Sequence, residues 1–104
     1  MSEITLTDIN ENIVGEHYFT AADGYCWADG QNRERSVYPS ALGLLTFCVL
    51  VLKNGFTVIG ESACVDPKTF DREIGQQIAR ENAIEKVWPL MGYELKTKLS
   101  KGEE

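Results

Sequence analysis

Glu81 is the residue whose spacing points most directly to chemistry. It stands three residues from Ile78 and from Ile84, and seven residues from Ile74 and from Trp88. Helical periodicity therefore places its carboxylate within an apolar stripe. A buried charge must find a cation or hydrogen-bond donors, or else bind a proton. Three interpretations of Glu81 follow. Its carboxylate reaches solvent or pairs with Lys or Arg, it is a ligand-facing or catalytic acid at a subunit seam, or the assumed helix phase is wrong.

Glu61 lies in a β-rich run, where we expect it to face Cys48 beside Thr46 and Thr57. A cysteine next to a carboxylate is a weak nucleophile, because the negative charge disfavours the thiolate. The single histidine, His17, lies outside any recognised triad spacing, and no nucleophile elbow, phosphate loop or paired-carboxylate motif occurs. We therefore predict no catalytic residue and no enzymatic activity, and we interpret Glu61 as a polar lining residue or an edge-strand hydrogen-bonding group.

Aromatic and arginine side chains concentrate in the segment 20–40. Its Asp-Gly and Tyr-Pro dipeptides and its lack of periodicity predict a long irregular loop. Aromatic residues and arginine dominate protein interfaces, and they also stack on bases and clamp phosphates. The candidate binding residues, which include the two carboxylates above, are Tyr25, Trp27, Arg33, Arg35, Tyr38, Glu61 and Glu81.

The cysteines Cys26, Cys48 and Cys64 are widely spaced, and no C-x-x-C pair occurs. With one histidine in the chain, a four-ligand zinc site is not expected, and an odd number of cysteines excludes an even disulfide framework. We predict no metal, no cofactor and reduced thiols. We expect no signal peptide, because residues 1–10 lack a basic region and an apolar run, and the longest apolar run, 42–52, is too short to span a membrane.

The composition describes an ordinary small globular chain. It has 104 residues with 16 acidic and 10 basic side chains, a formal charge of −6. This length favours a single domain over residues 1–104. Long nucleic acids and anionic membranes require local positive charge, so we expect neither as a partner.

A short helix is predicted at the N-terminus. Thr5 or Thr7 can accept a hydrogen bond from a free amide of the first turn, and the helix is expected to end near Val14, with Gly15 as its stop. A longer helix is predicted near the C-terminus at about 67–88.

The C-terminal helix has a clear start and stop in the sequence. Asp66 can cap it with Pro67 at its first position, and Pro89 is expected to break or kink it. The tail 97–104 is expected to be frayed.

The dipeptide Asn-Gly at 54–55 separates two β-rich runs, at about 44–53 and 56–65. Asn-Gly tolerates the two positive φ angles of a type I′ turn, which predicts an antiparallel hairpin with a two-residue loop. The loop would set a register in which Val51 faces Val58. The fold class is therefore α+β, in the order α-β-β-α, with the hairpin packed on the C-terminal helix.

In that register both faces of the hairpin carry apolar side chains. One face collects Leu45, Phe47, Val49, Val51, Phe56, Val58 and Cys64. The other collects Leu50, Leu52, Ile59 and Ala63 together with Thr46, Cys48, Thr57 and Glu61. One helix covers only one face of a sheet, so the second face must meet the N-terminal helix, another subunit or a partner. We expect a homo-oligomer joined through this face or through a hairpin edge.

Several uncommon short sequence motifs occur together and in order. They are VGEHY at 14–18, LTFCVL at 45–50, KNGFTV at 53–58, GESAC at 60–64, IARE at 78–81 and WPL at 88–90. Over roughly residues 4–97 the chain resembles the family of small phage and prophage proteins named after gene product forty-nine of phage N-four and gene sixty-six of phage Sf-six. The signature residues Asn54, Gly55, Gly60, Glu61, Glu81 and Trp88 are explained by the turn, a close backbone approach and the core.

The resemblance implies a phage-encoded protein that works in the host bacterial cytoplasm, and it transfers no functional residue. With no catalytic constellation in the sequence, the function expected is that of a non-enzymatic accessory protein that binds and modulates a host protein, for example an anti-phage defence factor. The alternative is a sponge-like binder of a small nucleotide signal at a subunit interface, and a small enzyme ranks below both.

Overall fold

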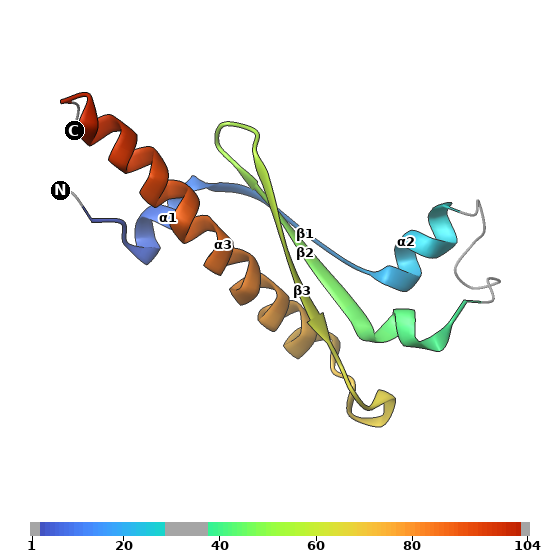
Figure 1. The fold of residues 1–104 in the computed structure, drawn as a ribbon. Coiled ribbons are helices and arrows are strands. Elements are labelled where there is room, and N and C mark those ends of the chain that lie inside the picture. The colour runs from blue at the N-terminus through green and yellow to red at the C-terminus, as the bar shows by residue number, and fades with distance from the viewer. Residues whose placement is uncertain (1–2, 29–37, 103–104) are drawn as a thin grey trace.

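The structure, a computed structural model, describes residues 3–28 and 38–102. Its elements are the helices and strands α1 (Leu6–Asn12), β1 (Ile13–Thr20), α2 (Ala21–Ala28), the 3-10 helix η1 (Ser40–Leu44), β2 (Leu45–Leu52), β3 (Thr57–Ala63), the 3-10 helix η2 (Pro67–Thr69) and α3 (Arg72–Ser100). The predicted α+β fold is confirmed, with a hairpin packed on a long C-terminal helix (Figure 1). The strand β1 and the helix α2 are additional to the predicted elements.

The N-terminal helix α1 begins where a reciprocal cap forms. Asp8 N–H donates to Thr5 Oγ1 at 3.2 Å, and Thr5 N–H donates to Asp8 Oδ2 at 2.9 Å. The helix ends at Asn12 instead of Val14, because the next residues join β1. Gly15 is therefore a strand residue opposite Val51, and its prediction as a helix stop was wrong.

The three strands form one antiparallel sheet in the order β1-β2-β3. The hairpin β2–β3 has a three-residue loop, in which Gly55 N–H donates to Leu52 O at 2.9 Å. Within this loop only Gly55 has a positive φ, 90°, whereas a type I′ turn needs two such residues. Asn54 instead accepts a hydrogen bond from Phe56 N–H through its side chain at 2.9 Å.

This loop shifts the register by one residue from the prediction. Val51 faces Thr57, and Val58 faces Leu50. Because side chains alternate between faces, the shift moves every side chain of β3 to the face opposite the one predicted. Gly60 and Val58 thus lie on the same face as Cys48 and Leu50.

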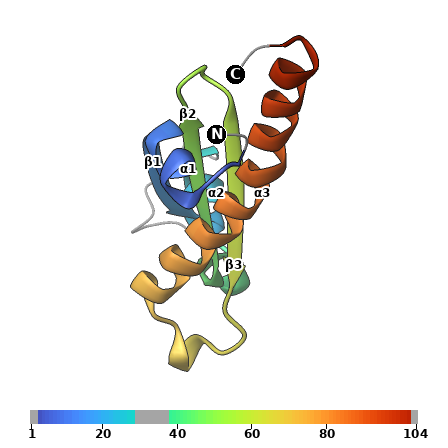
Figure 2. The same cartoon turned by 90° about the vertical axis from the view of Figure 1, so that its left-hand side faces the viewer.

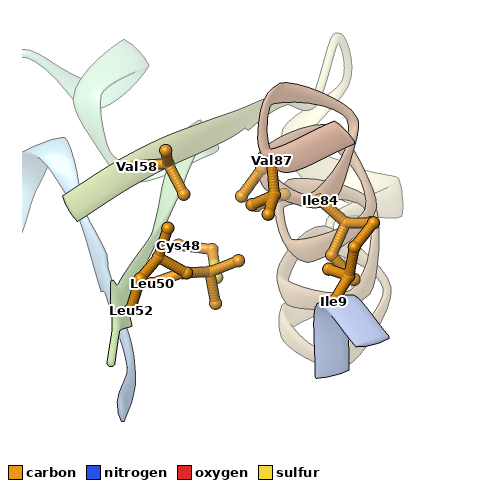
Figure 3. Close-up of a cluster of buried hydrophobic side chains, with 9 residues drawn as sticks. Ile9, Cys48, Leu50, Leu52, Val58, Ile84 and Val87 are labelled. Carbon is orange, nitrogen blue, oxygen red and sulfur yellow. The ribbon is translucent and has the colours of Figure 1, made fainter. Parts of the chain in front are cut away.

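That face is covered by α1 and α3. In Figure 2 both helices lie in front of the strands, and Figure 3 shows the side chains that meet between the helices and the sheet. The buried cluster consists of Ile9, Cys48, Leu50, Leu52, Val58, Ala79, Ala83, Ile84 and Val87. The N-terminal helix therefore shares the face that α3 already covers and leaves the second face uncovered.

The long helix α3 crosses the sheet at its tightest point over Gly60. A Cβ atom on Gly60 would collide with the carbonyl oxygen of Ala79 and the amide nitrogen of Ala83. The backbones of β3 and α3 can approach this closely only because three small residues meet there. This is the close backbone approach that the signature glycine predicted.

The ends of α3 differ from the prediction. Asp71, and not Asp66, caps it, accepting hydrogen bonds from Glu73 N–H and Ile74 N–H; Asp66 caps the separate turn η2. The helix continues through Pro89, which is exposed, to Ser100, so residues 97–100 are helical and not frayed. No helix in the described ranges has the length and apolarity needed to cross a membrane.

The segment 20–40 is only partly the irregular loop that was predicted. Its first third is α2, which starts with a second reciprocal cap: Thr20 N–H donates to Asp23 Oδ2 at 2.9 Å, and Asp23 N–H donates to Thr20 Oγ1 at 3.2 Å. The elements α2 and η1 stand at the end of the sheet opposite α1 (Figure 1). Arg33 and Arg35 lie outside the described residues.

Candidate functional site

The face of the sheet away from α3 carries a band of apolar side chains. We call the open face the five residues that form this band, namely Phe19 of β1, Phe47, Val49 and Val51 of β2, and Ile59 of β3. The register places Phe19 directly opposite Phe47, and their ring centroids are 5.7 Å apart. Phe19 is 39% exposed and Ile59 is 41% exposed, so the band reaches solvent from one edge of the sheet to the other.

The accessible surface of the chain is larger than that of a typical folded monomer of the same mass. A folded monomer of 11.6 kDa has an accessible surface of about 5,800 Å², whereas this chain exposes 7305 Å². Its radius of gyration is 17.2 Å, against about 13 Å for a compact domain of this length. The thinnest dimension is 17 Å, which is one helix layer on one sheet. The open face contributes to this surface, since Phe19 and Ile59 at its margins are about 40% exposed.

The predicted site residue Glu61 lies on the side of the sheet that carries the open face. It faces Phe47 instead of Cys48, because the register is shifted by one residue. Its exposed carboxylate is 3.8 Å from Lys86 Nζ, and its backbone carbonyl accepts a hydrogen bond from Asn82 Nδ2 at 2.8 Å. Glu61 is thus an edge-strand residue tied to α3, and no thiol lies beside it on this face.

Glu81 reaches solvent, as one of the alternatives for its carboxylate held, but the apolar stripe predicted around it was wrong in part, because Ile74 and Ile78 are exposed as well. Glu81 is exposed on α3, and the helix instead turns the small residues Ala79 and Ala83, together with Ile84 and Val87, toward the sheet. Counting only large apolar residues had rotated the predicted buried stripe away from these alanines. The structure therefore does not bring Glu81 into a pocket.

The aromatic candidates Tyr25 and Trp27 belong to α2, which follows directly after β1. Trp27 is 86% exposed, so its indole is free for contact with another molecule. Tyr38 is half-buried, and its ring passes within 3.8 Å of where a Cβ on Gly43 would stand, which places it against η1. The aromatic residues are therefore divided between an exposed helix and a packed turn.

A polar cluster that the sequence did not reveal joins α1, β1 and α3. Arg80 Nε donates to Glu16 Oε1 at 2.9 Å, and a second guanidinium nitrogen donates to Asn10 Oδ1 at 3.0 Å. Tyr18 Oη donates to Glu16 Oε1 at 2.8 Å. These partners are far apart in the sequence, and only the pairing of β1 in the sheet brings them together.

The electrostatics of this cluster is that of a structural ion pair. The hydrogen bond from Arg80 lowers the pKa of Glu16, and the same bond raises the pKa of Arg80. Burial, followed by the hydrogen bond to Glu16, raises the pKa of Tyr18. Burial also raises the pKa of the Cys48 thiol, which is the opposite of what an activated nucleophile requires.

An open groove of about 640 Å³ lies between α1, the hairpin loop and the C-terminal half of α3. Leu52, Phe56 and Met91 contribute to its apolar lining. Its charged lining comprises three carboxylates and two ammonium groups, those of Asp8, Glu11, Glu94, Lys53 and Lys98. Within residues 3–28 and 38–102, no cluster of His, Cys, Asp and Glu is arranged to hold a metal ion.

Comparisons with known proteins identify the family of the chain. Curated proteins and solved structures gave no match. A family model, described as phage protein (N4 Gp49/phage Sf6 gene 66) family, matches residues 4–99. This range contains all the described helices and strands except Ser100, the last residue of α3. The chain belongs to this phage protein family.

Proposed function

We propose that the chain is a non-enzymatic phage accessory protein that binds and modulates a host protein in the bacterial cytoplasm, and that the open face is its binding surface. The observation that carries the proposal is the uncovered apolar band on a chain exposing 7305 Å². Contiguous apolar surface of this kind on a small domain marks an interaction site.

The charge of the chain and the shape of the face indicate the chemistry of the partner. The open face is apolar along β2, and the chain has a formal charge of −6. A partner that presents an apolar patch surrounded by Lys and Arg would fit both properties, because charge complementarity steers encounter while apolar burial supplies affinity. Trp27, exposed on α2, is of the residue type most often found to dominate interface energetics.

The chemistry of the polar groups supports binding over catalysis. The Cys48 thiol is buried with a raised pKa, and the Glu16 carboxylate is paired with Arg80. Neither group is poised to attack or to transfer a proton to a substrate.

The alternative role, a sponge for a small nucleotide, remains a prediction. The groove between α1, the hairpin loop and α3 does not favour it, because three carboxylates against two ammonium groups line this groove and offer a phosphate no net positive charge. A nucleotide panel separates the two roles, since saturation of a specific site at about a hundred times its Kd would add about 2.7 kcal/mol to the free energy of unfolding and raise the Tm.

The test of the proposal uses variants of the open face and a matched control. Tagged protein is used to capture host proteins from bacterial lysate, and a captured protein is then purified and titrated against the wild type, Ile59→Lys and Phe19→Lys. The control is Tyr93→Lys, because Tyr93 is 79% exposed but lies on α3, away from the open face.

We expect both open-face variants to lose at least tenfold in affinity while Tyr93→Lys binds as the wild type does, with unchanged circular dichroism in all three. The proposal is wrong if the purified partner binds Ile59→Lys and Phe19→Lys as tightly as the wild type, or if no host protein is captured while a nucleotide raises the Tm.

A further inference from the structure

Side chains of α3 cover part of the β3 edge of the sheet. In β3, the residues that do not exchange hydrogen bonds with β2 point their backbone groups outward. Two of these outward carbonyls are occupied: Ile59 O accepts from Lys86 Nζ at 2.6 Å, and Glu61 O accepts from Asn82 Nδ2 at 2.8 Å. An added strand would have to displace both side chains at these two positions, which makes pairing at this edge less favourable.

The alternation of hydrogen bonds along the sheet shows which groups of β1 point outward. Leu52 N–H donates to Phe56 O at 2.9 Å, so every second residue of β2 from Leu52 bonds to β3, and the residues between them bond to β1. The register pairs those intervening residues with odd-numbered residues of β1. The N–H and C=O groups of Glu16 and Tyr18 therefore point away from the sheet.

Thr20, the next even-numbered residue, supports this assignment. Its N–H donates to Asp23 Oδ2 at 2.9 Å and not to β2. For Glu16 and Tyr18, in contrast, no described residue bonds to the outward N–H and C=O groups. The β1 edge thus keeps four backbone groups available to another strand.

We propose that this edge pairs with the same edge of a second copy of the chain, in antiparallel orientation around a two-fold axis. A symmetric pair requires that each outward residue face an outward residue of the second copy, which leaves few registers. If the two-fold axis passes through Glu16, the Glu16 carboxylates of the two copies face each other, which is unfavourable. If the axis passes through Tyr18, Glu16 of one copy faces Thr20 of the other, and the Thr20 N–H is already bonded to Asp23.

If the axis passes through His17, all four outward backbone groups of Glu16 and Tyr18 find hydrogen-bond partners in the other copy. Glu16 of each copy then faces Tyr18 of the other, and the two pairs exchange four hydrogen bonds. The two His17 residues face each other in the non-hydrogen-bonded position on the open-face side. The result is a six-stranded sheet in which the two open faces continue side by side, while β3 of each copy forms a capped outer edge.

The first test is a cysteine crosslink in a Cys64→Ser background, because Cys26 and Cys48 are buried. In the proposed register the Cα atoms of residue 17 in the two copies are about 4.5 Å apart, within reach of a disulfide. Those of residue 19 are about 14 Å apart, four residues along the strand. We expect His17→Cys to convert to a covalent dimer under mild oxidation and the control Phe19→Cys to remain monomeric on a non-reducing gel. Equal crosslinking of both variants, or of neither, would overturn the proposal.

The second test removes one outward donor and is read by light scattering. Glu16→Pro deletes the N–H that points to the second copy and also the carboxylate, whereas Glu16→Ala deletes only the carboxylate. We expect wild type and Glu16→Ala to have twice the 11.6 kDa chain mass at high micromolar concentration, and Glu16→Pro to have the mass of one chain with its circular dichroism retained. A monomeric wild type contradicts the proposal, and so does a folded Glu16→Pro dimer. If Glu16→Pro does not fold, the crosslink alone decides.

Discussion

The two faces of the sheet are built from the same central strand and end in opposite environments. β2 is apolar on both sides, with Cys48, Leu50 and Leu52 on the covered face and Phe47, Val49 and Val51 on the open face. The helix α3 packs on the first face because Gly60 lets it approach the strands there. Apolar side chains therefore indicate where burial is possible, whereas small residues indicate where a second element can come close enough to provide it.

The largest expected effect is at the point of closest approach. Gly60→Ala would place a methyl group against the backbone of α3 at Ala79 and Ala83. Because backbone cannot move aside as a flexible side chain can, we expect a loss of about 3 kcal/mol or more in the free energy of unfolding.

Urea denaturation measures this loss, and Gly92→Ala is the matched control. A Cβ at Gly92 meets nothing within 4 Å, so alanine there should stabilise α3 by about 0.5–1 kcal/mol. If Gly60→Ala unfolds at the same urea concentration as the wild type, α3 does not cross β3 as described.

The next comparison sets two neighbouring residues of β2 against each other. Leu50 is fully buried against α3, and we expect Leu50→Ala to cost about 2–5 kcal/mol. Val49 lies on the open face, where its neighbours shield it only in part, so Val49→Ala should cost about 1 kcal/mol or less. Urea melts of the two variants in parallel check the assignment of faces, and equal losses would show that both faces are covered.

A smaller effect is expected from the ion pair at the margin of the covered face. The pKa of Glu16 is lowered in the folded state, so the stability that it contributes is present above its unfolded pKa of about 4.5 and is lost as pH falls through the lower folded pKa. Both side chains are about a third exposed, so solvent screening limits the contribution to about 0.5–1 kcal/mol.

Glu16→Gln tests this pH dependence. The difference in unfolding free energy between wild type and Glu16→Gln should be constant from pH 5 to pH 7 and should shrink as the pH is lowered below about 4.5. A difference that grows on acidification would have the wrong sign for a carboxyl with a lowered pKa.

The smallest effect is expected at the margin of the open face. Ile59→Thr changes a side chain at the sheet edge that is already 41% exposed, so we expect a change within about 0.5 kcal/mol in the free energy of unfolding. The same variant should bind less of a hydrophobic fluorescent dye than the wild type. A large loss of stability would mean that Ile59 is buried by contacts within the chain.

Sequence reasoning predicted the hairpin, both terminal helices and the surplus of apolar surface, because long periodic runs and caps are local signals. It missed β1, in which Gly15, Glu16 and His17 interrupt the apolar pattern. It missed α2 as well, although Thr20 and Asp23 repeat the cap that Thr5 and Asp8 form in α1.

The candidate site was predicted less well than the fold, and one residue explains much of the difference. Whether Asn54 adopts a positive φ decides between a two-residue and a three-residue loop, and this choice moves Glu61 from beside Cys48 to the opposite face. The ion pair between Glu16 and Arg80 could not be predicted either, because it depends on strand β1, which the sequence did not indicate.

The capped edge of β3 also determines how far association through the sheet can proceed. Lys86 and Asn82 bond to two of its outward carbonyls, so in the proposed dimer β1 is the edge that pairs and β3 is the edge less open to a further strand. When a second copy pairs with β1, both β1 edges are covered and the two β3 edges form the outside of the sheet. Under that proposal, growth through sheet edges beyond two chains would be disfavoured, because each remaining edge is a partly capped β3 strand.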